Sequence, residues 1–334
     1  MAKIYFDKDV KLTPIKKKVV GIIGYGNQGA AQALNIRDSG IEVIVGNRSD
    51  AYSRNAKRDG FPTFSIREAV KRADILIIAI PDEIQEQIYK RHIQPFLRSG
   101  QVMNFASSYG IRFKCIVPPT DIDVVMMSPR AMGVTVRESF VDGKSVPGFI
   151  AVAQDATGRA HKIVLALAKA IGCTRVGVVE CTFENETDVN LFAEQGLWPL
   201  LHEAILLSYE VMVEHGVPPE VALLEFYASG ETSEVFRQIA LCGMYRQAPY
   251  HSPTSQYGML SRSEMLPRKE MKKRMVGVIR DIRNGKFAKE WAQEQSSGYS
   301  RFNKLKKRAG KHPVNRTELK VKALCASPKN FSTV

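Results

Sequence analysis

Between Lys18 and Cys181 the sequence alternates short apolar runs with stretches of helical periodicity, and this pattern most restricts the possible folds. The apolar runs are continuous, as in strands whose two faces are both buried. Helical stretches between such strands indicate a parallel sheet covered by helices on both sides, the doubly wound α/β architecture. We expect strands at residues 19–23, 42–46, 73–81, 101–106, 122–129, 148–154 and 174–180.

After Thr182 the strand pattern stops, and apolar residues recur at the spacing of helices. A chain of 334 residues is long enough for two separate cores. We therefore expect an α/β domain over residues 1–181, an all-α domain over 182–300 and a basic tail over 301–334. The helical stretches are 186–214, 218–247 and 266–297, with breaks at 216–219 and 249–258.

The formal net charge of +14 is concentrated at the end of the chain. Residues 301–334 hold ten Lys or Arg and one acid, which gives +9, and the rest of the chain contributes +5. Such a segment could bind nucleic acid or another polyanion. Because it lacks apolar periodicity, we favour a solvated, poorly ordered extension, and we do not expect a nucleic-acid partner.

The composition also argues against several other classes of protein. The apolar runs are shorter than the roughly 20 residues of a membrane helix, and the start MAKIYFDKDV lacks the apolar core of a signal peptide. The five cysteines are scattered without a C-x-x-C pair, so neither a disulfide framework nor a zinc knuckle is indicated. We expect a soluble, cytoplasmic protein without membrane contact.

A glycine-rich loop, Gly24-Tyr25-Gly26-Asn27-Gln28-Gly29, follows the first strand of the pattern and opens a helix. The spacing G-x-G-x-x-G is weak evidence alone and much stronger between a strand and a helix. The first glycine permits a tight turn, the second lets the backbone approach a pyrophosphate, and the third allows close helix packing. The loop therefore predicts a dinucleotide site at the start of this helix.

The end of the second strand bears on which dinucleotide is bound. A site that prefers NAD usually places an acid there to hold the ribose hydroxyls, but this strand ends at Asn47. Arg48, Ser49 and Ser53 could instead bind a 2′-phosphate through their donors. We favour NADPH, and Asp50 keeps NADH possible.

Six motifs follow one another in an order that resembles the ketol-acid reductoisomerase family in its short form: GYGNQG, ALNIRDSG, PDEIQ, SVPGFIAVAQDATG, ETDVNLFAEQ and TSQYG. The resemblance covers residues 3–291 and leaves the tail outside. It implies a Mg²⁺-dependent alkyl shift of an acetohydroxy acid, followed by reduction with NADPH. It also implies a knotted helical domain shared between two subunits, hence a homodimer or larger assembly of dimers, and adds Asp82 to the cofactor site.

The metal positions implied by the resemblance are only partly retained. In the family one helix supplies an Asp that bridges two Mg²⁺ ions and, four residues later, a Glu; here they correspond to Asn190 and Glu194. The amide at 190 brings no charge to a cation that prefers carboxylates. A second helix, from the partner subunit, carries Glu-x-x-x-Glu. Glu225 matches the first position, while the second falls on Ser229 or, with two extra residues, on Glu231.

Two further motifs depart from the family pattern. FAHGFNIHF is FASSYGIRF here, which places Ser107 where the family has His, and PKGPG is PRAMG, which places Arg130 where it has Lys. Arginine does not release a proton near neutral pH, and serine has no group that titrates in the working range. Ser252 matches the serine that binds the substrate carboxylate. Glu194, Arg130 and His251 are candidates for stabilising or protonating the reduced oxygen.

We therefore expect an NADPH-dependent reductase of a small 2-oxo or imino acid, with the isomerisation step weakened or lost and Mg²⁺ uncertain. One alternative is a working ketol-acid reductoisomerase of branched-chain amino acid biosynthesis that uses Glu231. Another is a pseudoenzyme that binds dinucleotide as a scaffold or sensor. Of the other acids near Glu194, we expect Glu184 and Asp188 on a solvated helix start and Glu186 just behind the site.

Overall fold

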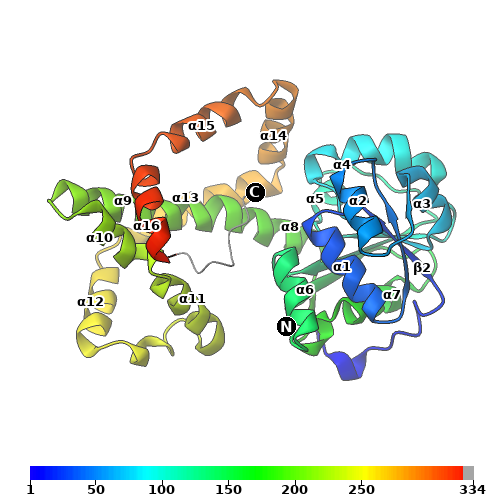
Figure 1. The fold of residues 1–334 in the computed structure, drawn as a ribbon, viewed down its shortest axis with the longest axis horizontal. Helices are drawn as coiled ribbons and strands as arrows, with labels where there is room; N and C mark the ends of the chain where they lie inside the picture. The colour runs from blue at the N-terminus through cyan, green and yellow to red at the C-terminus, as the bar shows by residue number, and fades with distance from the viewer. Residues whose placement is uncertain (326–334) are drawn as a thin grey trace. The chain divides into compact units, whose positions relative to one another are not determined.

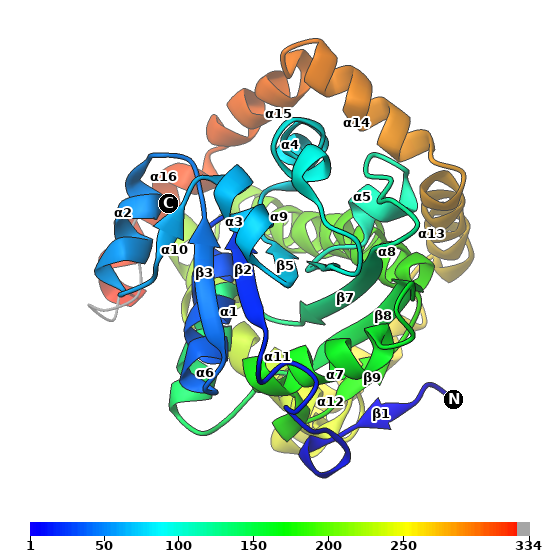
Figure 2. The same cartoon turned by 90° about the vertical axis from the view of Figure 1, so that its right-hand side faces the viewer.

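The computed structural model describes residues 1–325 and divides into two compact units, Met1–Asn190 and Leu191–Val334. The first unit is built on a nine-stranded sheet with the order β1-β9-β8-β7-β6-β5-β2-β3-β4 (Figures 1 and 2). Its strands are β1 (Ile4–Tyr5), β2 (Val19–Ile23), β3 (Glu42–Gly46), β4 (Thr63–Phe64), β5 (Ile75–Ile78), β6 (Val102–Phe105), β7 (Asp123–Pro129), β8 (Gly148–Gln154) and β9 (Val178–Glu180).

The strand directions follow the doubly wound pattern. Six strands, in the sheet order β7-β6-β5-β2-β3-β4, form a parallel part with β5 and β2 in its middle. β8 runs antiparallel to β7, and β1 antiparallel to β9. The predicted fold class is confirmed, and each of the seven expected strands is present. The sequence missed β1 and β4, because a strand of two residues has no periodicity to detect.

Helices cover both faces of the sheet. Successive strand residues point to opposite sides, and because the strands are apolar throughout, both faces must be buried. Ile22 and Ile77 face a core shared with α1 (Asn27–Asp38) and α7 (Ala160–Ile171), whereas Ile23 and Ile78 face a core shared with α3 (Ile66–Arg72). Burial of each isoleucine stabilises the fold by about 1.5–3 kcal/mol. The other helices are α2 (Ala51–Arg58), α4 (Asp82–Ile88), α5 (Tyr109–Arg112), α6 (Gly133–Val141) and α8 (Phe183–Phe192), with short turns η1 (Asp7–Asp9), η2 (Tyr89–Ile93), η3 (Gln94–Phe96) and η4 (Cys173–Arg175).

The second unit is helical throughout its described part, as predicted, but its breaks differ from the expected ones. The stretch 218–247 is interrupted at Gly230, which has a φ of 87°. The expected break at 249–258 instead contains a helix start, because the Ser252 side chain accepts from the Ser255 N–H and Pro253 occupies the first turn. The elements are η5 (Ala193–Leu197), α9 (Trp198–Glu214), α10 (Pro219–Leu223), η6 (Leu224–Ala228), α11 (Glu231–Cys242), η7 (Ala248–Tyr250), α12 (Pro253–Ser263), α13 (Arg268–Arg283), α14 (Lys286–Ser296), α15 (Ser300–Gly310) and α16 (Val314–Cys325).

The basic tail is not the poorly ordered extension that we expected, as far as residue 325. It forms α15 and α16, and α16 packs on α10 (Figure 1). Val321 is buried beside Leu223 and Tyr209, and the Tyr209 hydroxyl lies 2.8 Å from the Thr317 hydroxyl. α16 has few apolar residues, so the sequence alone did not show that one of its faces packs on α10. Residues 326–334 of the predicted tail lie outside the described part.

Over residues 1–325, none of the helices combines the length and the apolar character needed to span a bilayer.

Candidate cofactor and substrate site

The glycine-rich loop leaves β2 and enters α1 with the geometry that its spacing predicts. Gly24 has a φ of +96°, and a Cβ there would lie 2.8 Å from the carbonyl oxygen of Ala79. A Cβ at Gly29 would lie 2.0 Å from the carbonyl oxygen of Gly24, so the helix and the turn touch. At Gly26, by contrast, a Cβ would meet nothing within 4 Å. The backbone N–H groups at the start of α1 therefore face open space, as phosphate binding requires.

A cavity of about 590 Å³ lies over this loop. It is at the carboxyl ends of β2, β3, β5 and β6, where the chain connections diverge to the two sides of β2. Ligands of doubly wound sheets bind at this position. The open loop and the cavity fit a dinucleotide. Its walls include Gly24, Tyr25, Gly26, Asn27, Gln28, Asn47, Arg48, Asp50, Tyr52, Asp82 and Ser107.

The residues after β3 divide into two groups. Arg48 lines the cavity with its side chain 79% exposed, and its Nε lies 2.7 Å from Asp50 Oδ2. Burial alone would raise the pKa of Asp50, but hydrogen bonds from Arg48 and the Ser53 N–H together lower it. Ser49 and Ser53 are outside the cavity lining, and the Ser53 hydroxyl donates to the Asp50 carbonyl at 2.9 Å. The structure thus brings Arg48 to the site, whereas Ser53 forms the capping box of α2 with the N-cap residue Asp50.

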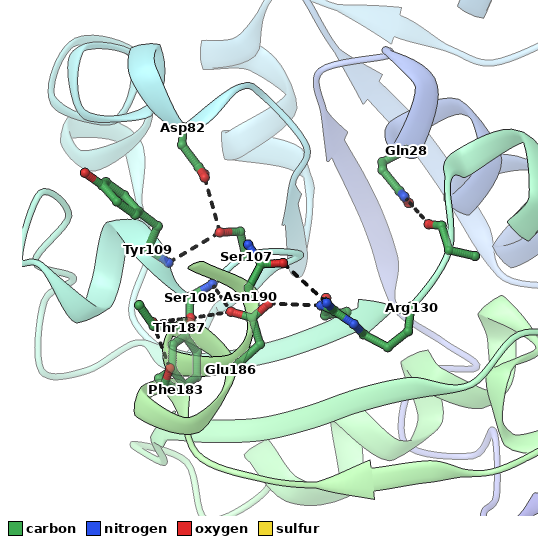
Figure 3. A network of polar contacts seen from close by, with 12 residues as sticks. Gln28, Asp82, Ser107, Ser108, Tyr109, Arg130, Phe183, Glu186, Thr187 and Asn190 are labelled. Carbon is green, nitrogen blue, oxygen red and sulfur yellow. Dashed lines mark hydrogen bonds and ion pairs between the residues drawn. The ribbon is translucent and has the colours of Figure 1, made fainter. Parts of the chain in front are cut away.

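Asp82 and Ser107 both line the cavity, and their side chains meet (Figure 3). The Ser107 hydroxyl donates to Asp82 Oδ2 at 3.2 Å, and Gln85 Nε2 donates to Asp82 Oδ1 at 2.8 Å. Ser107 follows β6, and Asp82 begins α4 after β5. Both residues therefore line the cavity over the glycine-rich loop.

The segment that holds Arg130 packs directly against the glycine-rich loop. Gln28 Nε2 donates to the Ala131 carbonyl at 2.8 Å (Figure 3). A Cβ at Gly133 would lie 2.2 Å from the carbonyl oxygen of Asn27, so glycine is required for this close approach. Arg130 is thereby fixed beside the cofactor loop.

Arg130 lies at the centre of a polar network (Figure 3). Its Nη1 lies 3.2 Å from Glu186 Oε1 and 3.4 Å from the Ser128 hydroxyl, and its Nη2 donates to Asn190 Oδ1 at 3.3 Å. The guanidinium carbon is also 4.9 Å from the centroid of the Phe149 ring, a cation–π contact. The guanidinium is therefore held from several sides.

Glu186 is the buried member of this network and contacts both Arg130 and Ser108. Its side chain is only 2% exposed, and its Oε2 accepts from the Ser108 N–H at 3.2 Å and from the Ser108 hydroxyl. The Thr187 hydroxyl lies 2.5 Å from that of Ser108. Burial raises the pKa of the nearby Cys181 thiol to about 11, and the charge of Glu186 adds to the increase.

The sequence placed Glu186 behind the site but did not foresee its ion pair, and it missed Ser108. The signal for Glu186 is its spacing of four residues from Asn190, which puts both on one helix face. The signal for Ser108 was the second Ser of FASSYGIRF, where the family pattern has Gly. Glu184 is exposed, as expected. Asp188 is buried, so the expectation of a solvated position is wrong for it.

The remaining predicted site residues belong to the second unit. Glu194 lies in the π-helical turn η5 and Glu225 in the π-helical turn η6, and both are exposed; such turns are frequent at functional sites. Glu231 begins α11. His251 Nε2 is 3.0 Å from Gln247 Oε1, and Ser252 caps α12.

The residues of the first unit do not fit a bridged pair of magnesium ions. The side chain at 190 is a neutral amide whose oxygen accepts from a guanidinium, whereas a hard dication prefers carboxylate oxygen. Within residues 1–325 no group of three or more His, Cys, Asp or Glu side chains is arranged to hold a metal ion.

The mostly parallel sheet, the open glycine-rich loop and the cavity at the switch point define a dinucleotide-binding protein of the doubly wound class. Residues 14–177 match the family described as "Acetohydroxy acid isomeroreductase, NADPH-binding domain", and residues 183–327 match "Ketol-acid reductoisomerase, C-terminal domain". The chain belongs to the ketol-acid reductoisomerase family. The match to residue 327 also corrects our expectation that the tail lies outside the resemblance.

Individual relatives agree with this assignment. The chain is 42% identical over 318 residues to a protein named ketol-acid reductoisomerase (NADP(+)) from Pyrococcus abyssi, covering 95% of each chain. It is 39% identical to the protein of the same name from Methanocaldococcus jannaschii, covering 98% of this chain and 100% of the relative. A solved structure of an NADH-preferring ketol-acid reductoisomerase from an uncultured archean superposes with a TM-score of 0.91, at 35% identity, covering 97% of this chain and 100% of that one. The predicted family and oxidoreductase class are confirmed.

Proposed function

We propose that this chain is an NADPH-dependent reductase of a small 2-oxo or imino acid, in which the metal-dependent isomerisation of its family is weakened or lost. The proposal depends on one contact, the hydrogen bond of 3.3 Å from Arg130 Nη2 to Asn190 Oδ1. This contact puts a neutral amide and a fixed cation where the family's metal bridge would need an anion.

The isomerisation is the step that this contact affects most. An alkyl shift needs a polarised ketone and a stabilised alkoxide at the same time, a task for two adjacent dications. A shared carboxylate offsets the repulsion between them, and an amide does not. The guanidinium at this amide is already paired with Glu186, so the pair supplies no net negative charge to hold two dications.

Reduction makes fewer demands on the site. It requires a nicotinamide and an electrophilic C=O or C=N bond held in contact, with one group that stabilises the product oxygen or nitrogen. The cavity supplies space for the cofactor, and Arg130 lies on the segment packed against the cofactor loop. NADPH is favoured because Arg48 lines the cavity and because close relatives are named for NADP(+); the NADH-preferring structure keeps NADH as a second cofactor.

A working ketol-acid reductoisomerase is the second candidate, and the identity of about 40% to relatives with that name along nearly the whole chain favours it. It would need Glu194 and Glu225, with Glu231 or Ser229, to complete a metal site despite Asn190. A pseudoenzyme that only binds the dinucleotide is the third candidate, motivated by Ser107 and Asn190.

The proposed assembly is a homodimer, or a larger assembly of dimers, formed by the knotted helical domain. The helices of the second unit carry large apolar side chains that are about half exposed, including Trp198, Leu207 and Val211. Contiguous exposed apolar surface is typical of protein interfaces, which is why these helices are the proposed contact. Light scattering of the purified protein should give at least twice the mass of one chain, and a monomer would refute this part.

The function is tested by following NADPH oxidation with a panel of 2-oxo and imino acids, each assayed with Mg²⁺ and with EDTA. We expect at least one of them to be reduced in EDTA. Tight NADPH binding without reduction of any compound would favour the pseudoenzyme, and reduction only of acetohydroxy acids, only with Mg²⁺, would favour the second candidate.

A further inference from the structure

We infer that the Arg130 guanidinium is the resident cation of the substrate site, positioned by Glu186 and Ser108 to bind the keto and carboxylate oxygens of a 2-oxo acid. This inference rests on the proposed reductase function and names the group that would recognise its substrate. It assigns to a side chain the charge that a metal supplies elsewhere in the family.

The position of Arg130 is set by groups that do not depend on a ligand. The Glu186 carboxylate is buried, and a buried carboxylate is costly without a charged partner and further hydrogen bonds. Arg130 provides the charge, while the Ser108 N–H and hydroxyl provide the hydrogen bonds. The ring of Phe149 supports one face of the guanidinium. The cation is therefore oriented before substrate arrives.

The guanidinium still has hydrogen-bonding capacity after these contacts. Of its five N–H donors, three are directed to Glu186, Ser128 and Asn190. Within residues 1–325, Nε–H and the second N–H of Nη2 have no protein acceptor. Nε and Nη2 form one edge of the planar group, the kind of edge that binds two oxygens in parallel. A 2-oxo acid offers two such oxygens, one from the ketone and one from the carboxylate.

Three departures from the family pattern lie in this one network: Ser108 replaces Gly, Arg130 replaces Lys and Asn190 replaces Asp. The formal charges of Glu186 and Arg130 cancel, and the amide at 190 adds none. An aspartate at 190 would give the trio a net negative charge, which repels a carboxylate substrate and attracts a dication. With asparagine, the trio suits an anionic substrate instead.

The reduction then proceeds without a metal. When bound, NADPH would supply a hydride to the keto carbon and become NADP⁺, and the electron pair of the C=O bond would move to oxygen. Arg130 stabilises the developing negative charge electrostatically. Because arginine does not give up its proton near neutral pH, the oxygen takes its proton from water.

Chemical rescue tests the role of Arg130. The substrate is 3-hydroxy-3-methyl-2-oxobutanoate, the ketone that an alkyl shift would produce from 2-acetolactate, assayed in EDTA. Arg130→Ala should lower kcat/KM by about 100-fold, and added guanidinium ion should restore part of it. Arg137→Ala is the matched control. Like Arg130, Arg137 forms an ion pair and a cation–π contact, but its partners are Asp38 and the Phe140 ring. This variant should keep near wild-type activity and show no rescue.

Glu186→Gln tests the positioning role of Glu186. We expect this variant to raise the KM for the ketone about 10-fold and to leave NADPH affinity unchanged. Glu186→Asp should recover part of the loss. NADPH titration reports folding, because Arg130 and Glu186 do not line the cofactor cavity. If Arg130→Ala does not fold, Arg130→Lys is used and should lose activity in EDTA.

Two results would overturn the inference while leaving the reductase function intact: full activity of the Arg130 variant, or reduction of the ketone by wild type only when Mg²⁺ is present. If wild type reduced no 2-oxo acid under either condition, the proposed function itself would fail.

Discussion

Replacing Gly26 by alanine should separate cofactor binding from folding. Gly26 has a φ of −80°, which alanine adopts without strain, and the added methyl group would meet no atom of the protein within 4 Å. Alanine is a poorer helix cap than glycine, but it also restricts the unfolded chain. The two effects are of similar size and opposite sign, so the free energy of unfolding should change by no more than about 0.5 kcal/mol.

The effect on the cofactor should be much larger. The methyl group would stand over the first N–H groups of α1, where the pyrophosphate is expected to lie. Loss of one hydrogen bond to a charged group costs about 1.5–3 kcal/mol, which corresponds to a dissociation constant about 10- to 150-fold higher. The measurements are an NADPH fluorescence titration and a thermal unfolding curve of the same sample.

Two control variants define the result. Gly258→Ala adds a methyl group in open space on α12 and should leave NADPH binding unchanged. Gly29→Ala forces a methyl group to within 2.0 Å of the Gly24 carbonyl oxygen, so it should reduce stability as well as binding. An unchanged dissociation constant for Gly26→Ala would refute the placement of the cofactor.

Three further predictions concern other parts of the chain. Arg48→Ala should weaken NADPH binding about 10-fold and leave NADH binding nearly unchanged, measured by parallel titrations, because only NADPH carries a 2′-phosphate. Since burial raises the pKa of Cys181 to about 11, its alkylation by iodoacetamide, followed by mass spectrometry, should be slow at pH 8 and rise about tenfold per pH unit up to pH 10. Val321→Ala should lower the free energy of unfolding by about 2 kcal/mol in a denaturant titration, because Val321 is buried against α10; no change would mean that α16 is not docked there.

The sheet was predictable because its strands are buried on both faces, so the chain itself carries their signature as continuous apolar runs. The start of α12 was missed because a segment rich in Pro and Ser was interpreted as a break, although Ser252 followed by Pro253 is also a helix start. α16 was missed because its few apolar residues form no clear helical pattern, and their burial depends on the α10 surface that they cover.

The cofactor loop was predictable from the spacing of its glycines, because Gly24 and Gly29 meet local steric requirements of the turn and Gly26 leaves the helix start open. Other parts of the site depend on tertiary contacts that no local pattern contains. Ser53 has the right chemistry for a phosphate, yet its hydroxyl caps α2. Glu186 resembles its acidic neighbours in sequence, and only the fold buries it and pairs it with Arg130.

The central claim is that reduction persists in this chain while rearrangement is weakened or lost. The most direct test compares NADPH oxidation by the wild-type protein with two substrates in saturating Mg²⁺: 2-acetolactate, which must first rearrange, and 3-hydroxy-3-methyl-2-oxobutanoate, which needs only a hydride. We predict turnover of the second compound and much slower turnover, or none, of the first. Conversion of 2-acetolactate to dihydroxyisovalerate at a rate similar to that of the ketone would contradict the claim.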